Sequence, residues 1–310
     1  MNRTRLLCLP LVLAACAATG NAGLLYTFGD NFGPFALSSM NPASAASVTT
    51  VNPQVGDGNS GFNGGLVAAN GLLYAIGNDS NNVATLYSMN TAGLDVSPVS
   101  SDFNNTGAAA GVIFSNGLAA AGSNFYAIGQ GATTENLYLI GAGSATDIQT
   151  LNTMNGNYAG LAWDAALNEF YAILENVNLG DFHGDYLVKF QLGGAVHLVA
   201  NLTALDGAGA GTHLGGLADT GAGILFDIYT NTNSINNTGL LEEIDLNGLP
   251  AVSTLYDTGI PLAQNAGIAF IPEPAPPLEI GAGLLLLCCA FRRRGIGGRR
   301  PQAAAARCSR

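Results

Sequence analysis

The fold follows from residues 65–76, which read GLVAANGLLYAI: a glycine with a short apolar run, an Asn-Gly turn, and a second apolar run that ends in an aromatic triplet. Asn-Gly between two apolar runs is a strong β-hairpin signal. The triplet Tyr-Ala-Ile at 74–76 recurs at 126–128 and 171–173, and the triplets at 26–28 and 226–228 fit the same place. A hairpin repeated about every 50 residues predicts a repetitive all-β protein.

Each repeat contains more than the hairpin. A glycine opens the first apolar run in four units, at residues 65–68, 117–120, 160–163 and 216–219. A third and a fourth short segment follow every triplet, as at 86–90 and 95–99 in the second unit. Four short strands in each repeat of about 50 residues are typical of a β-propeller blade.

The two ends of the repeat array predict how the ring closes. The first unit starts at residues 24–26 without its glycine-opened strand, and the missing strand stands at the other end as Gly267-Ile268-Ala269-Phe270. A C-terminal strand that completes the first blade leaves no open sheet edge. We therefore predict a five-bladed β-propeller over residues 23–271, closed by its C-terminal strand, with its aromatic triplets in the core. Another all-β repeat or a β-sandwich remains the alternative.

The charged residues are unevenly distributed. The chain has a net charge of -11, yet Lys189 is the only lysine or arginine between residues 23 and 271, where it faces 19 acids, a net of -18. Such a body repels phosphate backbones, which excludes nucleic acid as a partner. All five cysteines lie in the end segments. The body therefore has no disulfide, no cysteine-bound zinc and no cysteine nucleophile.

The N-terminus has the pattern of a secretion signal, assigned to residues 1–22. Arg3 and Arg5 precede an apolar run at 6–18 that is too short to span a bilayer. Small residues at the -3 and -1 positions predict cleavage after Ala22. The stretch Leu13-Ala14-Ala15-Cys16 resembles a bacterial lipobox, so lipidation of Cys16 is the alternative.

The C-terminus, residues 272–310, carries three elements in order: Pro272-Glu273-Pro274, an apolar run at 280–291, and Arg292-Arg293-Arg294. Prolines keep the motif extended, and arginines hold one end of an apolar helix at the cytoplasmic side. The pattern resembles the PEP-CTERM sorting signal of exported bacterial proteins. The resemblance implies a short transmembrane helix, an intermediate anchored in the inner membrane, cleavage by an exosortase-type enzyme, and a final place at the cell surface or outside the cell.

No strong catalytic motif is present in the body. The loops between the second and third strands are longest in the fourth and fifth units, and equivalent propeller loops share one face of the ring. We expect any loop binding surface there, with these residues at its rim: Asp181, His183, Asp185, Asn231, Asn233 and Asn236. The first three would hold a metal if their loop curls. The metal is unknown, no cofactor is expected, and Ca²⁺ stays open.

These features favour an exported, non-enzymatic surface or extracellular-matrix protein. The resemblance of its C-terminus implies an exopolysaccharide or envelope partner, which the loops would bind. The alternative is a metal-dependent hydrolase or lactonase of the kind that propellers host. That reading needs acids at the central channel, and the candidates are Asp164 and Asp219, which follow the glycine-opened strands of two units.

Overall fold

The computed structural model describes residues 23–29, 36–51, 62–79, 81, 83–115, 117–180, 182–206, 211–231, 238–261 and 267–273. Residues up to Pro272 belong to one compact unit, and Glu273 begins a second. The predicted signal peptide lies outside the described residues, and so does the predicted sorting segment beyond Glu273. Within the described part of the chain, no helix has the length and apolar character needed to cross a membrane.

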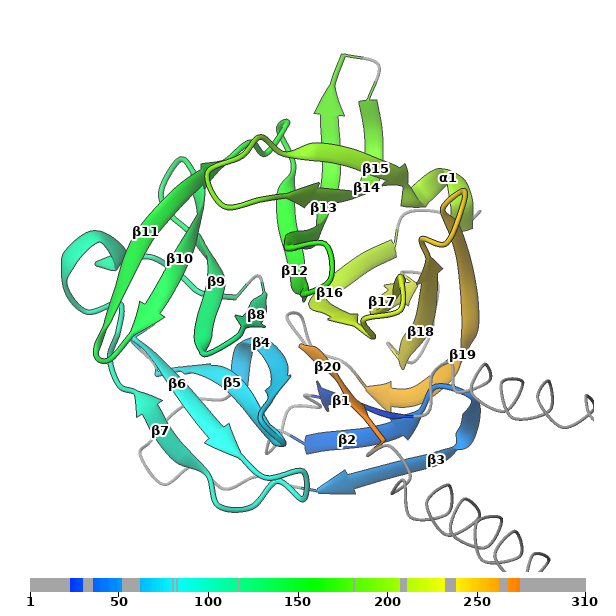
Figure 1. Ribbon diagram of the computed structural model, residues 1–310, viewed down its shortest axis with the longest axis horizontal. Helices are drawn as coiled ribbons and strands as arrows, with labels where there is room; N and C mark the ends of the chain where they lie inside the picture. Colours follow the sequence, from blue (N-terminus) through cyan, green and yellow to red (C-terminus); the bar gives the residue numbers. More distant parts are fainter. Residues whose placement is uncertain are drawn as a thin grey trace, which may run out of the picture. The chain divides into compact units, whose positions relative to one another are not determined.

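Five antiparallel sheets of four strands each form the unit, arranged around a common axis (Figure 1). Blade 1 contains β20 (Ile268–Pro272), β1 (Gly23–Gly29), β2 (Ala36–Asn41) and β3 (Ser44–Val51). Blade 2 contains β4 (Phe62–Ala69), β5 (Leu72–Asn78), β6 (Ala84–Met89) and β7 (Ser97–Ser100). Blade 3 contains β8 (Leu118–Ala121), β9 (Asn124–Gln130), β10 (Glu135–Gly141) and β11 (Ser144–Leu151). Blade 4 contains β12 (Asn157–Asp164), β13 (Glu169–Leu179), β14 (Phe182–Phe190) and β15 (His197–Asn201). Blade 5 contains β16 (Gly211–Asp219), β17 (Ile224–Asn231), β18 (Thr238–Asp245) and β19 (Ala251–Pro261).

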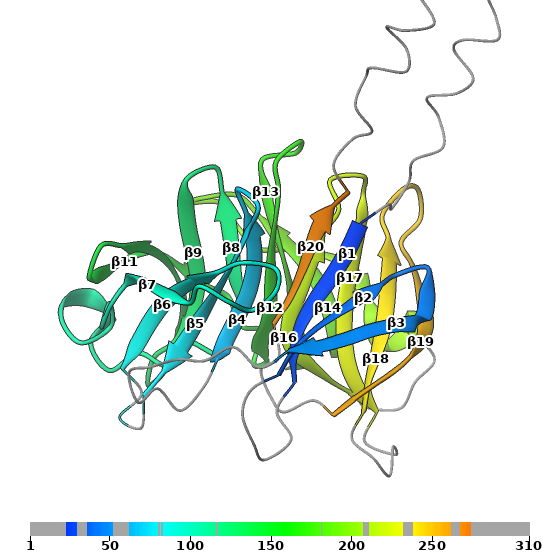
Figure 2. The same ribbon diagram turned by 90° about the horizontal axis from the view of Figure 1, so that it is seen from below.

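Two short helices accompany the strands among the described residues. The 3-10 helix η2 (Gly107–Ala109) precedes blade 3, and α1 (Leu202–Asp206) follows β15. The sheets stand side by side, so the strands run between the two faces of the ring (Figure 2).

The predicted closure of the ring is confirmed. Strand β20, from the end of the repeat array, pairs antiparallel with β1, and the ladder runs from Gly23 opposite Pro272 to Thr27 opposite Ile268. The Thr27 hydroxyl also donates a hydrogen bond of 2.9 Å to the Gly267 carbonyl. Figure 1 shows orange β20 beside blue β1. The chain is thus an all-β, five-bladed β-propeller, not a sandwich.

The core consists of apolar layers between neighbouring blades. One layer joins blades 1 and 2, and four others join the remaining neighbours, including blades 5 and 1. Because alternate residues of a strand point to opposite faces of the sheet, each middle strand contributes to the layers on both sides. The aromatic triplet residues Tyr26, Tyr126, Tyr171 and Phe226 are buried, as predicted, while Tyr74 is half-buried.

The inner strands approach one another most closely at their glycines. A Cβ atom on Gly117 would lie 2.7 Å from the Gly160 carbonyl carbon, and one on Gly160 would lie 3.0 Å from the carbonyl carbon of Gly216. A Cβ on Gly267 would lie 2.1 Å from the Leu66 nitrogen, and one on Gly65 would lie 2.6 Å from the backbone of blade 3. We call these residues, Gly65, Gly117, Gly160, Gly216 and Gly267, the glycine ring. Their lack of a side chain lets five backbones meet at the axis.

Candidate functional site: a pocket on the propeller axis

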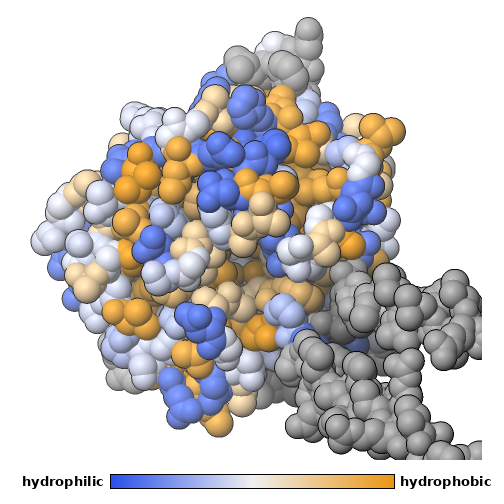
Figure 3. Space-filling model, in the orientation of Figure 1, coloured by the Kyte–Doolittle hydropathy of each residue, from blue (hydrophilic) through white to orange (hydrophobic). Residues whose placement is uncertain are grey.

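A pocket with a cavity volume of about 90 Å³ lies on the axis, formed by all five inner strands. Figure 3 shows a hollow near the middle of the ring, bordered largely by apolar residues. The lining residues are Val67, Ala68, Ala120, Leu161, Ala162, Trp163, Leu217, Ala218, Asp219, Ile268, Ala269 and Phe270. On each strand they come just after the glycine ring, so the tight backbone contacts narrow the channel at the base of the pocket.

The side chains of the pocket wall are alanines, larger aliphatic residues, two aromatic residues and one acid. Alanines from all five inner strands line it, Trp163 and Phe270 contribute aromatic rings, and Asp219 contributes a carboxyl group. Trp163 is half-buried, and its ring packs against Phe170 with ring centroids 4.6 Å apart. A pocket lined by both a partly exposed indole and a carboxyl is a suitable surface for a small polar molecule with an apolar face.

Asp219 has an altered acidity. Burial raises the pKa of Asp219 to about 6, the backbone N–H groups of Gly221 and Thr220 oppose the rise, and the nearby Asp164 adds to it. Burial also raises the pKa of Tyr171 to about 12, and the acids around it, Asp164 and Asp219 included, raise it further. The pocket therefore holds a carboxyl that titrates closer to neutral pH than a free aspartate does.

The predicted equivalence of Asp164 and Asp219 is wrong by one position. Asp219 pairs with Leu225 in its hairpin, as Trp163 pairs with Phe170, so Asp219 occupies the place of Trp163. Asp164 is one residue further on, and its Oδ1 accepts the N–H groups of Ala166 and Leu167 at 2.7 and 3.0 Å. Of the two acids, Asp219 lines the pocket and Asp164 holds a turn.

The predicted loop surface is only partly within the described residues. Asp181, Asn233 and Asn236 lie outside them. The backbones of His183 and Asn231 form part of β14 and β17, and only their backbones are described. The expectation of Asp185 at an exposed rim is wrong, because β13 and β14 continue as a long hairpin and turn Asp185 into the sheet interface, where it is 8 % exposed.

The strand directions also separate that predicted surface from the pocket. The inner strands run toward the pocket mouth and the second strands run back. The C-terminal ends of β13 and β17 and the N-terminal ends of β14 and β18 therefore lie on the opposite face of the ring.

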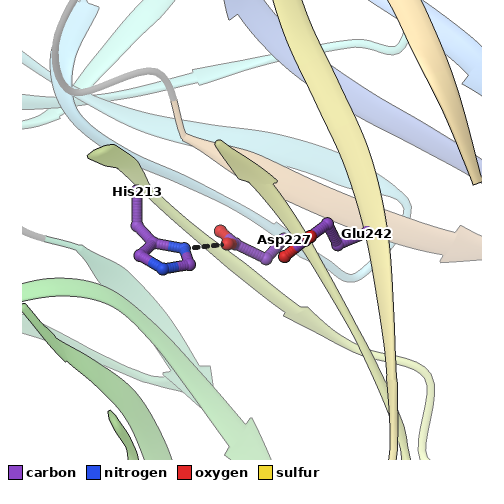
Figure 4. A group of neighbouring side chains, drawn as sticks. All are labelled: His213, Asp227 and Glu242. Atoms are coloured by element: carbon purple, nitrogen blue, oxygen red, sulfur yellow. Dashed lines mark hydrogen bonds and ion pairs between the residues drawn. The ribbon is translucent and has the colours of Figure 1, made fainter. Parts of the chain in front are cut away.

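A buried ionisable cluster between blades 4 and 5 was not predicted. His213 of β16, Asp227 of β17 and Glu242 of β18 point toward one another (Figure 4), and His213 Nδ1 is hydrogen-bonded to Asp227 Oδ2. Burial alone would lower the pKa of His213, but Asp227 and then Asp185 and Glu175 raise it to about 9. Burial raises the pKa of Glu175 to about 7 against the attraction of His213. One sequence signal was available, since Asp227 stands where three other triplets have alanine.

No family model matches the chain, and no curated protein matches it. Solved structures do match in fold. GH43B of the Bacteroides ovatus xyloglucan PUL is 10 % identical, with a TM-score of 0.52 over 82 % of this chain and 55 % of that one. TolB from Acinetobacter baumannii is 12 % identical, with a TM-score of 0.45 over 82 % of this chain and 68 % of that one. The TolB-like protein of Agrobacterium tumefaciens is 11 % identical, with a TM-score of 0.46 over 81 % and 98 %. The likeness at these identities is one of fold, and it agrees with the propeller seen in the strand order.

Proposed function

We propose that this protein is an exported, non-enzymatic β-propeller that binds a neutral glycan of the exopolysaccharide or envelope through the axial pocket. The observation that carries the proposal is that half-buried Trp163 and Asp219 both line that pocket. An aromatic plane stacks on the apolar face of a sugar ring, and a carboxyl accepts hydrogen bonds from its hydroxyls.

The size of the pocket and the charge of the protein body limit which glycans would bind. A volume of about 90 Å³ is small beside the ~300–1,000 Å³ of pockets that enclose a whole drug-sized ligand. The pocket would therefore take the terminal residue of a glycan, while the remainder lies across the face of the ring. A body with 19 acids and one lysine disfavours a polyanionic chain, which favours a neutral one.

The composition of the pocket favours binding over hydrolysis. Glycoside hydrolysis by the usual route needs two carboxyl groups flanking the bond that is cleaved. Among the described residues that line the pocket, Asp219 is the sole acid, and Asp164 is engaged in its turn.

Processing of both ends is part of the proposal and rests on the sequence pattern described above. The positions of the two expected processing points in the fold support this part of the proposal. Gly23, the residue after Ala22, pairs with Pro272, the first residue of the Pro-Glu-Pro motif. Pro272, the last residue of β20, and Glu273 are exposed, so a processing enzyme would find these two residues of the motif accessible. Removal of both ends would leave the closing strand pair in place.

The test is a glycan array and calorimetric titration with the full-length protein, its Trp163→Ala variant and the control Leu249→Ala, which changes a residue that is 92 % exposed and outside the pocket. Binding of a neutral glycan by the wild type and the control, with at least a tenfold loss in Trp163→Ala, would support the proposal. Equal binding by all three proteins, binding of polyanionic glycans alone, or cleavage of the bound glycan would refute it. Mass spectrometry of the secreted protein tests the processing, which predicts a mature chain without residues 1–22 and without the apolar run at 280–291.

A further inference from the structure

The interface between blades 4 and 5 concentrates acidic groups. Glu175 and Asp185 come from blade 4, and His213, Asp227 and Glu242 come from blade 5. Asp227 is 0 % exposed and Glu242 is 1 % exposed. Four carboxyl groups and one imidazole thus share one largely buried region.

No basic side chain of the protein body balances this charge. Lys189, the only lysine or arginine between residues 23 and 271, is bound to Glu169 with Nζ 2.9 Å from Oε2. His213 is therefore the single cationic candidate among the described residues of the cluster. Burying carboxylates without a compensating charge costs free energy, so their presence here indicates that another group offsets this cost.

Two of the acids occupy places that hold no charge in the other blades. Asp227 lies directly opposite Glu242 in the β17–β18 ladder, and directly opposed like charges destabilise a sheet. The equivalent pairs are Thr27–Ser38, Ala75–Tyr87, Ala127–Tyr138 and Ala172–Val188. Packing alone is thus satisfied by uncharged pairs in four blades, and blade 5 differs for another reason.

One oxygen of Asp227 is left without a partner. Oδ2 is bonded to His213 Nδ1, but Oδ1 is buried and has no hydrogen-bond partner. Glu242 Oε1 accepts the Thr254 hydroxyl at 3.4 Å. A buried, unsatisfied carboxylate oxygen costs free energy that a bound cation would recover.

We propose that His213, Asp227 and Glu242 bind a divalent transition-metal cation of the Zn²⁺ or Mn²⁺ type. One ligand atom from each of the three residues lies within 4.8 Å of the others (Figure 4). An imidazole nitrogen with two carboxylates suits these cations, whereas Ca²⁺ and Mg²⁺ take oxygen ligands. This site differs from the loop at residues 181–185 in which the sequence suggested a metal.

The second nitrogen of His213 supports this assignment. His213 Nε2 faces Asp185 Oδ2 at 3.8 Å, an ion-pair distance that is longer than a hydrogen bond. Histidines that bind metal with one nitrogen usually donate the other N–H to a carboxylate, which fixes the orientation of the ring. Asp185 is itself held by the N–H of Asn176 at 2.8 Å and by its own N–H to the Thr203 hydroxyl at 2.9 Å. Asp185 would therefore position the ligand His213 by electrostatic attraction, and a hydrogen bond would form if the two groups came closer.

The burial of the ligands indicates what the metal does. His213, Asp227 and Glu242 are all closed to solvent, so a substrate would not reach the cation. The metal would join three adjacent strands of blade 5 and, through Asp185, connect them to blade 4. Its role is structural stabilisation of that interface.

The experiment uses full-length protein treated with a chelator and then titrated with Zn²⁺ and, separately, with Mn²⁺ in a calorimeter and a thermal melt. The wild type is expected to bind one equivalent of at least one of them and to melt at a higher temperature. Asp227→Asn, which is isosteric, is expected to bind about 100-fold more weakly or worse and to lose the melting shift. The matched control is Glu135→Gln, another buried acid, which accepts the Tyr158 N–H at 2.8 Å in a different blade interface.

The remaining outcomes also decide the proposal. Glu135→Gln must keep both binding and shift. Failure of the wild type to bind either cation would overturn the proposal and indicate that the opposed acids share a proton. Unchanged affinity in both Asp227→Asn and His213→Gln would also overturn it, because the cation would then bind elsewhere. If Asp227→Asn does not fold, Glu242→Gln takes its place, and loss of the visible spectrum of bound Co²⁺ in His213→Gln reports the nitrogen ligand directly.

Discussion

Replacing Gly160 by alanine tests whether the glycine ring is close-packed. A Cβ on Gly160 would lie 3.0 Å from both the Gly216 carbonyl carbon and the Leu217 Cβ, and Gly160 has a φ of +72°. Gly71 has a φ of +76° and open space around its missing Cβ, so Gly71→Ala is the matched control. The control measures the cost of the left-handed backbone alone, about 1–2 kcal/mol before the opposing effect on the unfolded chain.

The difference between the two variants isolates the contact at the axis. Overpacking in a well-packed core costs about 1–3 kcal/mol. We therefore expect Gly160→Ala to lower the free energy of unfolding by about 1–3 kcal/mol more than Gly71→Ala, because the contacting atoms are backbone and a Cβ and have little room to move. Urea denaturation of the full-length proteins measures this, with the fluorescence of Trp163, the single tryptophan, and circular dichroism as independent probes.

Equal destabilisation by the two variants would refute the argument. It would mean that the inner strands have room for a methyl group at the axis and that the glycines serve only the backbone conformation. A larger loss in Gly71→Ala than in Gly160→Ala would contradict it more strongly.

Three further predictions concern single side chains. The pKa of Asp219 is raised in the folded state, so ionisation of this carboxyl lowers the stability of the fold as pH rises from about 4 to about 6. Asp219→Asn should therefore be more stable than wild type by about 1–2 kcal/mol at pH 7, a value reduced because the carboxyl is only half-buried, and equally stable at pH 3. A gain in stability that does not depend on pH in chemical denaturation would contradict this. Phe170 is fully buried among aromatic rings, so Phe170→Ala should cost about 3–5 kcal/mol by urea denaturation, and a cost below 1 kcal/mol would argue against the packing. Lys189→Met removes a partly exposed ion pair with Glu169 and should change stability by less than about 1 kcal/mol, whereas a larger loss in the same assay would show that the pair is shielded from solvent.

The repeat made the fold predictable from the sequence. The triplet at 74–76 recurs in five related forms, so errors in one unit are corrected by the others. The absent first strand at residue 24 and the extra one at 267–270 then required a closed ring, which the β1–β20 ladder confirms.

The residues of the sites were less predictable because they depend on register. A slip of one residue moves a side chain to the other face of a strand, and β-bulges at the glycine ring add such slips, as between Ala159 and Leu161. Asp164 was expected at the axis, but it stands one residue beyond Trp163, and Trp163 is the residue that corresponds to Asp219 at the end of the runs 160–163 and 216–219. His213, Asp227 and Glu242 are separated along the chain and meet only through the pairing of three strands.

The glycine ring limits how a propeller of this kind can change in evolution. Tandem duplication of a repeat would add a sixth inner strand and push the others outward, which would separate the glycines and open a void at the axis. Deletion of a repeat would force together backbones that already leave no space for a methyl group. The number of blades is therefore fixed by the backbone at the centre, whereas the turns at the outer ends of the blades are free to accumulate insertions and diverge.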